Sequence, residues 1–285
     1  MGDHGLLTQW PLNRDVLRIP QALWHNTQTE SLYRTAPRIF LALDYDGTLV
    51  PIAPSPSEAR PSPELLATLA QLSKDPTLSV TIVSGRQLSD LCALISVPGL
   101  TYIGTHGAEL CTANGDTRQL VPTGVLTMTV ARLQRELLPI FAHVPGLLLE
   151  NKRFALALHY RLAQPEVEEW AIGQFVAVVQ DHLRKGLALE IIYGKKVIEV
   201  RQIGVNKGHA LRTLLATALP MTLPIYIGDD QTDEDAFQFL DGRGLTILVA
   251  DHPRPTAAHY LLNNPREVLR FLGSLRALRD SSQSA

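Results

Sequence analysis

The stretch IFLALDYDGTL, residues 39–49, joins five apolar residues to two aspartates and a glycine turn. A short, unbroken apolar run that ends at a turn is typical of a buried strand in a parallel sheet. Asp44 and Asp46 follow this run directly, and their spacing lets both carboxylates face one side while the chain stays extended. Ligands bind beyond the carboxyl ends of strands in open α/β sheets, so the stretch predicts a site as well as a fold.

Strands and helices alternate on both sides of this stretch. Ser62 followed by Pro63 predicts a capped helix, and SVTIV (79–83) predicts the next strand. The same alternation continues in a helix through Leu88, Leu91 and Leu94, then LTYIG (100–104), LPIYIG (223–228), TDEDAFQFL (232–240) and LTILVA (245–250). This pattern predicts an α/β fold with a doubly wound, Rossmann-like parallel sheet that helices cover on both faces.

The pattern changes between residues 123 and 203. Two helices are expected there, one with Leu126, Val130, Leu133 and Leu137 on one face and one from Pro165 to a stop at Gly186. Two predicted hairpins accompany them, LLLENKR with ALALHYR and ALEIIY with KVIEVR. We therefore expect a core of residues 38–122 and 204–285, an inserted α+β unit of residues 123–203, and a loosely attached arm of residues 1–37.

Composition excludes several classes of protein. The 285 residues carry 26 Lys and Arg against 28 Asp and Glu, a net charge of -2, which disfavours a nucleic-acid partner. No apolar run approaches the ~18 residues of a membrane span, and the first residues lack the pattern of a secretory signal. We expect no membrane partner and a cytoplasmic location. Cys92 and Cys111 lack the spacing of a zinc site or a disulfide framework.

Polar residues at the predicted strand ends indicate phosphate chemistry. The candidates are Asp44, Asp46, Ser84 in SGR, Lys207 in GVNKG, and Asp229, Asp230 and Asp233 in GDDQTD. Several carboxylates in one pocket repel each other unless a cation neutralises them, and an oxygen-only ligand set favours Mg²⁺. Lys207 and Ser84 would then contact a phosphate group, and Asp44 becomes a candidate carboxylate nucleophile.

Other motifs that could explain these residues are absent from the sequence. It contains no GxxxxGK[ST] loop and no GxGxxG after a strand, and IVSGR lacks the first glycine of a GxSxG elbow. A nucleotide P-loop and an acyl-transfer hydrolase are therefore disfavoured.

The motifs DYDGTL, SGR, NKG and GDDQTD together resemble the four signatures of the haloacid-dehalogenase (HAD) superfamily of phosphotransferases. The pieces GTHGAE, ENKRFALALHYR and GKKVIEVRQIGVNKG are similar to the trehalose-6-phosphate phosphatase branch. The resemblance implies a HAD-type core with a C2-type cap. It also implies that Asp44 is the nucleophile, that Asp46 is the general acid and base, and that Asp229 binds Mg²⁺ together with Asp44 and the Asp46 carbonyl.

The remaining roles also follow from the resemblance. Ser84 and Lys207 would hold the phosphoryl group, and Asp233 would support the metal site. Sugar contacts are implied for Arg86 and Glu109 in the core and for Glu150, Lys152, Arg161, Lys195 and Glu199 in the cap. The family more often has proline where Gln202 stands and Asp where Asn151 stands.

The expected function is hydrolysis of trehalose 6-phosphate through an aspartyl-phosphate, by a monomer that works beside a separate trehalose-6-phosphate synthase. A phosphatase of sucrose 6-phosphate or glucosylglycerol phosphate, or a sugar-phosphate sensor without activity, remains an alternative. His106 and His159 are expected to be hydrogen-bonded structural residues rather than ligands.

Overall fold

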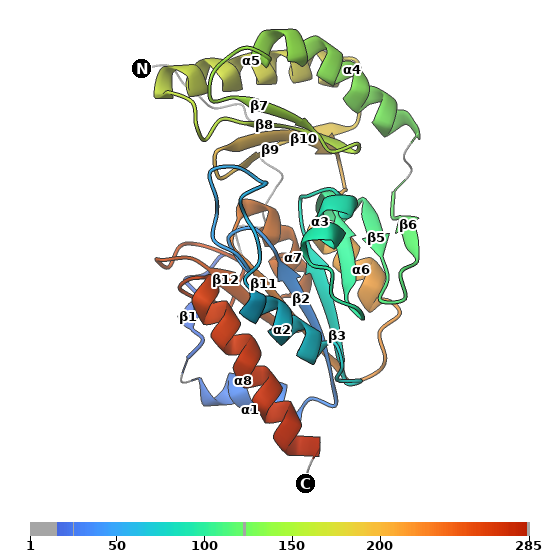
Figure 1. The fold of residues 1–285 in the computed structure, drawn as a ribbon, viewed down its shortest axis with the longest axis vertical. Coiled ribbons are helices and arrows are strands. Elements are labelled where there is room, and N and C mark those ends of the chain that lie inside the picture. The colour runs from blue at the N-terminus through green and yellow to red at the C-terminus, as the bar shows by residue number, and fades with distance from the viewer. Residues whose placement is uncertain (1–15, 25, 122–123, 284–285) are drawn as a thin grey trace.

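Two sheets organise the chain, and both are visible in the computed structural model (Figure 1), which describes residues 16–24, 26–121 and 124–283. The larger sheet has nine strands and lies in the lower part of the view, and the smaller sheet has four strands and lies above it. Within these described ranges, no helix is long and apolar enough to cross a membrane.

The larger sheet confirms the predicted parallel fold. In spatial order its strands are β1 (Gln21–Ala22), β13 (Tyr260–Leu262), β12 (Leu245–Val249), β11 (Thr222–Gly228), β2 (Arg38–Asp44), β3 (Leu78–Val83), β4 (Thr101–Gly104), β5 (Glu109–Cys111) and β6 (Thr117–Gln119). Pairing is parallel from β1 through β4, whereas β5 and β6 add an antiparallel edge that the sequence pattern did not predict.

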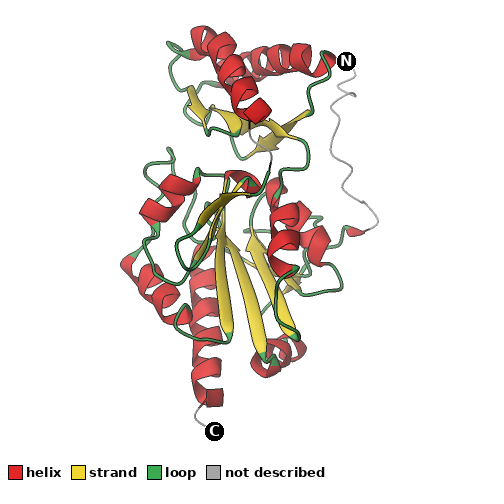
Figure 2. Cartoon of the chain, turned by 90° about the vertical axis from the view of Figure 1, so that its right-hand side faces the viewer, coloured by secondary structure: helices red, strands yellow, loops and turns green. Residues whose placement is uncertain are grey.

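Helices cover both faces of this sheet, as Figure 2 shows. One face packs against α1 (Thr27–Thr35), α2 (Pro63–Leu72), α3 (Leu88–Leu94) and α8 (Pro265–Gln283), and the other face packs against α6 (Lys207–Leu215) and α7 (Glu234–Leu240). The predicted start of α2 is confirmed, since Ser62 accepts a hydrogen bond from the amide of Leu65 and Pro63 is the first helical residue.

The strand order brings two acidic strand ends together. The chain leaves β2 toward β3 on one side and later places β11 on the other side of β2, so the order reverses between β2 and β11. Leu43 pairs with Ile227 across these two parallel strands. Asp44, the next residue of β2, and Asp229, the residue after β11, therefore emerge at the same edge, where open α/β sheets bind ligands.

The smaller sheet belongs to the segment between β6 and α6. Its strands, in spatial order, are β7 (Leu148–Asn151), β8 (Ala155–His159), β10 (Val197–Gln202) and β9 (Leu189–Gly194), all antiparallel. One face packs against α4 (Gly124–Phe141) and α5 (Pro165–Arg184), and the other face looks toward the carboxyl edge of the large sheet (Figures 1 and 2). We call residues 124–202 the insert. The expected boundary at residue 123 lies outside the described residues.

The prediction of a loosely attached arm is wrong for the described part of residues 1–37. Strand β1 pairs in parallel with β13, and Leu23 and Tyr33 are buried. The Tyr33 ring packs edge-on against Phe271 of α8 with centroids 5.6 Å apart. The segment is attached by tertiary contacts of a two-residue strand and a nine-residue helix, which are too short to leave a clear periodic pattern.

Candidate active site

A cleft of about 1060 Å³, measured out to its open mouth, lies between the carboxyl edge of the large sheet and the insert. The core lines it with Asp44, Asp46, residues 52–56, Ala59, residues 84–86, His106, Lys207, Asp229, Asp230 and Thr232. The insert lines it with Glu150, Lys152, His159, Arg161, Ile192, Gly194, Lys195, Val197 and Glu199. Most of the predicted site residues therefore face one space.

Three buried carboxylates form the floor of this cleft. Asp44, Asp229 and Asp233 place one oxygen each within 4.8 Å of the others. Burial, with the neighbouring negative charges, raises the pKa of Asp44 well above its usual range and raises the pKa of Asp229 to about 6. These shifts are those of like charges held together away from water, which a bound cation would relieve.

Lys207 supplies a fixed positive charge at this floor. It is the first residue of α6, where the Asn206 side chain caps the helix. Its Nζ lies 2.6 Å from Asp44 Oδ1 and 2.7 Å from Asp233 Oδ1. Burial would lower the pKa of Lys207, but the two carboxylates outweigh burial and raise it, so the ammonium stays charged. A cation at the positive end of a helix is unfavourable by itself, and these anions compensate for it.

Asp233 is already saturated with hydrogen bonds. Its Oδ1 accepts from Lys207 and from the Tyr226 hydroxyl at 2.6 Å, and its Oδ2 accepts from the amides of Asp229 and Asp230, both at 2.9 Å. Its pKa is lowered because the Lys207 charge outweighs burial. Asp44 and Asp229 are less occupied, so they are the two carboxylates of this cluster that are better placed to ligate a cation.

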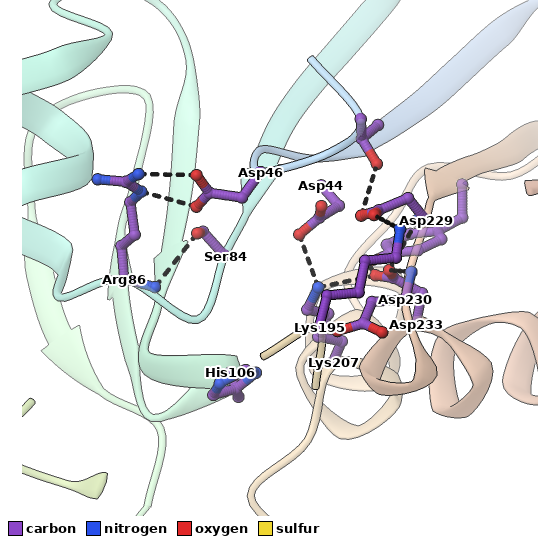
Figure 3. A network of polar contacts seen from close by, with 12 residues as sticks. Asp44, Asp46, Ser84, Arg86, His106, Lys195, Lys207, Asp229, Asp230 and Asp233 are labelled. Carbon is purple, nitrogen blue, oxygen red and sulfur yellow. Dashed lines mark hydrogen bonds and ion pairs between the residues drawn. The ribbon is translucent and has the colours of Figure 1, made fainter. Parts of the chain in front are cut away.

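Asp46 points away from the cluster, as Figure 3 shows. Arg86 donates to both of its oxygens, from Nε and Nη2, at 2.7 Å each. The Arg86 guanidinium also lies over the Tyr45 ring, 5.1 Å from its centre. Ser84, at the end of β3, accepts a hydrogen bond from the Arg86 amide at 3.2 Å. The Asp46 carboxylate is thus held at the wall of the cleft, and Asp46 is not a carboxylate ligand in this arrangement.

The insert brings a second charged cluster to the opposite wall. Glu199 is buried, with Oε2 2.6 Å from Lys152 Nζ and Oε1 3.0 Å from Nε2 of His106, a core residue. Glu150 lies 2.7 Å from Nε2 of His159. His159 is thus hydrogen-bonded to Glu150, His106 lies in contact with Glu199, and both histidines line the cleft.

Two further insert residues lie near the mouth of the cleft. Arg161 donates to the backbone oxygen of Lys195 at 2.5 Å, and Lys195 forms an ion pair with Asp229 (Figure 3). Glu109 is the one predicted sugar contact that does not line the cleft. It accepts from the Thr105 hydroxyl at 3.3 Å and lies 3.7 Å from the Arg153 guanidinium.

Several residues in or around the cleft have features that the sequence does not reveal. His106 lies in GTHG with a positive φ of 55°, and its preceding residue, Thr105, has a φ of 45°. Such angles are uncommon outside glycine and often accompany functional sites, but they are visible only in a structure. Tyr226 looks like an ordinary apolar strand residue. Gln87 donates to the backbone oxygen of Asn151 at 3.0 Å and so links core and insert.

Sheet order, buried aspartates at the carboxyl edge and an inserted antiparallel unit define the class of the protein, a HAD-type phosphatase fold. Residues 42–266 match the model of the trehalose-phosphatase family, and the chain belongs to that family. The resemblance seen in the motifs is thereby confirmed.

Individual relatives agree with this assignment. The chain is 34% identical over 272 residues to a trehalose-phosphate phosphatase of Mycobacterium marinum (strain ATCC BAA-535 / M), covering 92% of this chain and 67% of that protein. It is 34% identical over 254 residues to probable trehalose-phosphate phosphatase J of Arabidopsis thaliana, covering 84% of this chain and 67% of that protein. The C-terminal domain of trehalose-6-phosphate phosphatase from C. albicans superimposes with a TM-score of 0.78 at 26% identity, covering 92% of this chain and 99% of that chain.

The buried Glu199 pair gives a prediction about stability. Burial would raise the pKa of Glu199, but Lys152 and His106 hold it well below its usual range. Because the folded pKa lies below the unfolded value, this carboxylate stabilises the fold above about pH 4.3, and that contribution is lost as the pH falls further. Glu199→Gln should lower the free energy of unfolding at pH 7 by about 3 kcal/mol, since it leaves Lys152 buried without its partner.

The difference in the free energy of unfolding between wild type and Glu199→Gln should narrow by about 1.4 kcal/mol per pH unit below about pH 4.3. Urea unfolding from pH 7 to the lowest pH at which the protein stays folded measures this difference. Glu169→Gln, at an exposed position on α5, is the control and should behave as wild type. A difference that stays constant with pH would contradict the assigned charge state of Glu199.

Proposed function

We propose that the protein hydrolyses trehalose 6-phosphate to trehalose and inorganic phosphate. The observation that carries the proposal is the position of Asp44, a buried carboxylate at the end of β2 beside Lys207 and Asp229, on the floor of a cleft that a charged insert covers. Membership of the trehalose-phosphatase family and the activities for which its relatives are named support this choice of substrate.

The acidic floor fits a hard divalent cation, and we propose Mg²⁺. The donors are carboxylate oxygens from Asp44, Asp229 and Asp233, close enough together to surround one ion. Asp44 and Asp229 would ligate it directly with the Asp46 carbonyl, and Asp233 would hold Lys207 and the Asp229 backbone in place. Bound Mg²⁺ would neutralise charge on the phosphoryl oxygens.

The chain's own residues then divide the reaction into two steps. Asp44 attacks phosphorus in line and forms an aspartyl-phosphate while the bond from phosphorus to the sugar oxygen breaks. Asp46 gives its proton to that sugar oxygen, and in the second step takes a proton from the water that attacks the aspartyl-phosphate. Lys207 and Ser84 stabilise the phosphoryl group throughout. Asp46 has to open at least one of its two hydrogen bonds with Arg86 to take part.

Recognition is assigned to the insert. We propose that residues 123–203 act as a cap over a catalytic core of residues 38–122 and 204–285. Its proposed sugar contacts are Glu150, Lys152, Arg161, Lys195 and Glu199, together with Arg86 and Glu109 of the core. We further propose a cytoplasmic monomer that receives its substrate from a separate synthase and has no nucleic-acid or membrane partner.

A phosphate-release assay with purified protein tests the function. Trehalose 6-phosphate with Mg²⁺ should be hydrolysed with a kcat/KM well above that for sucrose 6-phosphate, glucosylglycerol phosphate or glucose 6-phosphate. Excess chelator should abolish the activity, and added Mg²⁺ should restore it, because the carboxylates otherwise repel each other and the phosphate. Equal rates on all four sugars would rule out the substrate, and full activity in chelator would rule out the metal.

Asp44→Asn should reduce kcat by roughly 10⁴-fold or more while the protein stays folded, because an amide does not form the acyl-phosphate. Near-ultraviolet circular dichroism checks folding. Acid quenching during turnover of a ³²P-labelled substrate should trap labelled wild-type protein and no labelled Asp44→Asn protein. Label in the variant, or near-normal turnover, would exclude Asp44 as nucleophile.

Arg161→Ala tests recognition by the insert. The change removes a cation from the mouth of the cleft and should lower kcat/KM for trehalose 6-phosphate by roughly tenfold to a hundredfold, the range for one charge-assisted contact. Hydrolysis of a small aryl phosphate should fall much less. Arg184→Ala, on an exposed position of α5, is the matched control and should not affect either substrate. Equal losses on both substrates would show that Arg161 does not read the sugar.

A further inference from the structure

The turn between β9 and β10 lies directly against the acidic loop of the core. Lys195 at this turn forms an ion pair with Oδ2 of Asp229, although the two residues belong to different sheets (Figure 3). Gly194 also approaches Asp230, since a Cβ at Gly194 would lie only 3.1 Å from Asp230 Oδ2. Arg161 fixes the turn from the other side through the Lys195 carbonyl. These contacts therefore join the turn of the insert to the acidic loop of the core.

Two lysines share the charge of the three buried carboxylates. Lys207 contacts Asp44 and Asp233, and Lys195 contacts Asp229, so the cluster carries one net negative charge when all three carboxyls are ionised. The two lysines differ in how easily their side chains can move away from the carboxylates. The Lys207 side chain is 3% exposed and held by two carboxylates, whereas the Lys195 side chain is 45% exposed and held by one. A divalent ion that replaces Lys195 brings the cluster to neutrality.

The ammonium of Lys195 occupies an oxygen that a metal ion at this cluster would also need. Asp229 Oδ1 lies toward the Thr48 hydroxyl at 3.4 Å, and Oδ2 is taken by Lys195. We propose that Lys195 occupies Asp229 in the metal-free protein and that metal binding displaces it into the cleft, where its charge becomes available to an anionic substrate. Lys195 thereby couples metal binding to substrate recognition, an inference that rests on the metal site of the proposed function.

This coupling has a thermodynamic consequence. A lysine held by Asp229 is withheld from the substrate, so the metal-free protein lacks one of its cleft cations. By linkage, a substrate phosphate that attracts Lys195 away from Asp229 favours metal binding to the same extent that the metal favours the substrate. The metal and the phosphate ester therefore strengthen each other's binding through a residue that does not need to touch the metal.

The chain contains a matched control in the next residue. Lys196 belongs to the same turn and carries the same charge, but its Nζ contacts both oxygens of Glu168 on α5, at 2.6 and 2.8 Å. A substitution that removes the charge of Lys196 therefore alters the charge of the turn but leaves the ion pair between Lys195 and Asp229 in place.

Isothermal titration with Mg²⁺, without substrate, tests the proposal on wild type, Lys195→Met and Lys196→Met. Lys195→Met should bind Mg²⁺ roughly tenfold more tightly than wild type, the order expected when one competing charge-assisted contact is lost at a half-exposed side chain. Lys196→Met should bind with the wild-type Kd. A Kd for Lys195→Met equal to or weaker than that of wild type would overturn this inference. Phosphate release from trehalose 6-phosphate by the wild-type protein would then still leave the proposed function standing.

Amide hydrogen exchange distinguishes displacement of Lys195 from Asp229 from a general effect of the lysine charge on Mg²⁺ affinity. Residues 193–197 of wild type should exchange faster when Mg²⁺ is added, because the turn loses its contact with Asp229. The same residues of Lys195→Met should exchange fast with or without Mg²⁺. If Lys195→Met changes the Kd but Mg²⁺ does not speed exchange of residues 193–197 in wild type, the proposed displacement of Lys195 is wrong. Absence of Mg²⁺ binding by wild type would overturn this inference together with the metal site.

Discussion

The repulsion among buried carboxylates is the constraint on which the rest of the structure depends. Asp44 and Asp229 emerge side by side because β2 and β11 pair in parallel at the point where the strand order reverses. Burial without neutralisation would protonate them or drive the strands apart. Lys207, 163 residues after Asp44, provides the neutralising charge from the start of α6. The site is therefore complete only after the chain has formed α6 and has placed β11 beside β2. The insert lies in the sequence between β6 and α6.

The insert is held over this site mainly by polar contacts. Its apolar cluster is largely its own. Among the residues that the structure describes, only Ala108 and Val205 from outside residues 124–202 join its buried set. Bonds to the core run instead through Gln87 with the Asn151 backbone, His106 with Glu199 and Lys195 with Asp229. Polar contacts exchange readily with water, whereas an apolar interface would resist separation. Such an arrangement would suit the proposed cap, which has to admit a substrate and cover it.

The sequence predicts best what depends on local pattern. The apolar run before Asp44, the Ser62 cap and the period of the insert helices each fix their element from neighbouring residues, and the family motifs place the main acids. Pairings between distant charges are not local. Nothing near Asp46 indicates that Arg86 binds both its oxygens, and nothing in GKK indicates that Lys195 reaches Asp229 while Lys196 reaches Glu168. The attachment of β1 is missed for the same reason, since a two-residue strand is defined by its partner β13.

Charge balance explains how such a cleft can exchange its contents. Four of its cations are already paired with carboxylates, Arg86 with Asp46, Lys152 with Glu199, Lys195 with Asp229 and Lys207 with Asp44, so these pairs bury little unbalanced charge. A phosphate monoester carries about −1.5 to −2 charges at neutral pH, and a divalent ion carries the opposite charge. When the phosphate ester and the divalent ion enter together, the total charge of the cleft hardly changes. Each ion pair of the cleft can then exchange one of its charged groups for a ligand of the same sign. Recognition then requires rearrangement of existing ion pairs rather than burial of new charge, and a lysine on an exposed turn is the member of the set that rearranges at least cost.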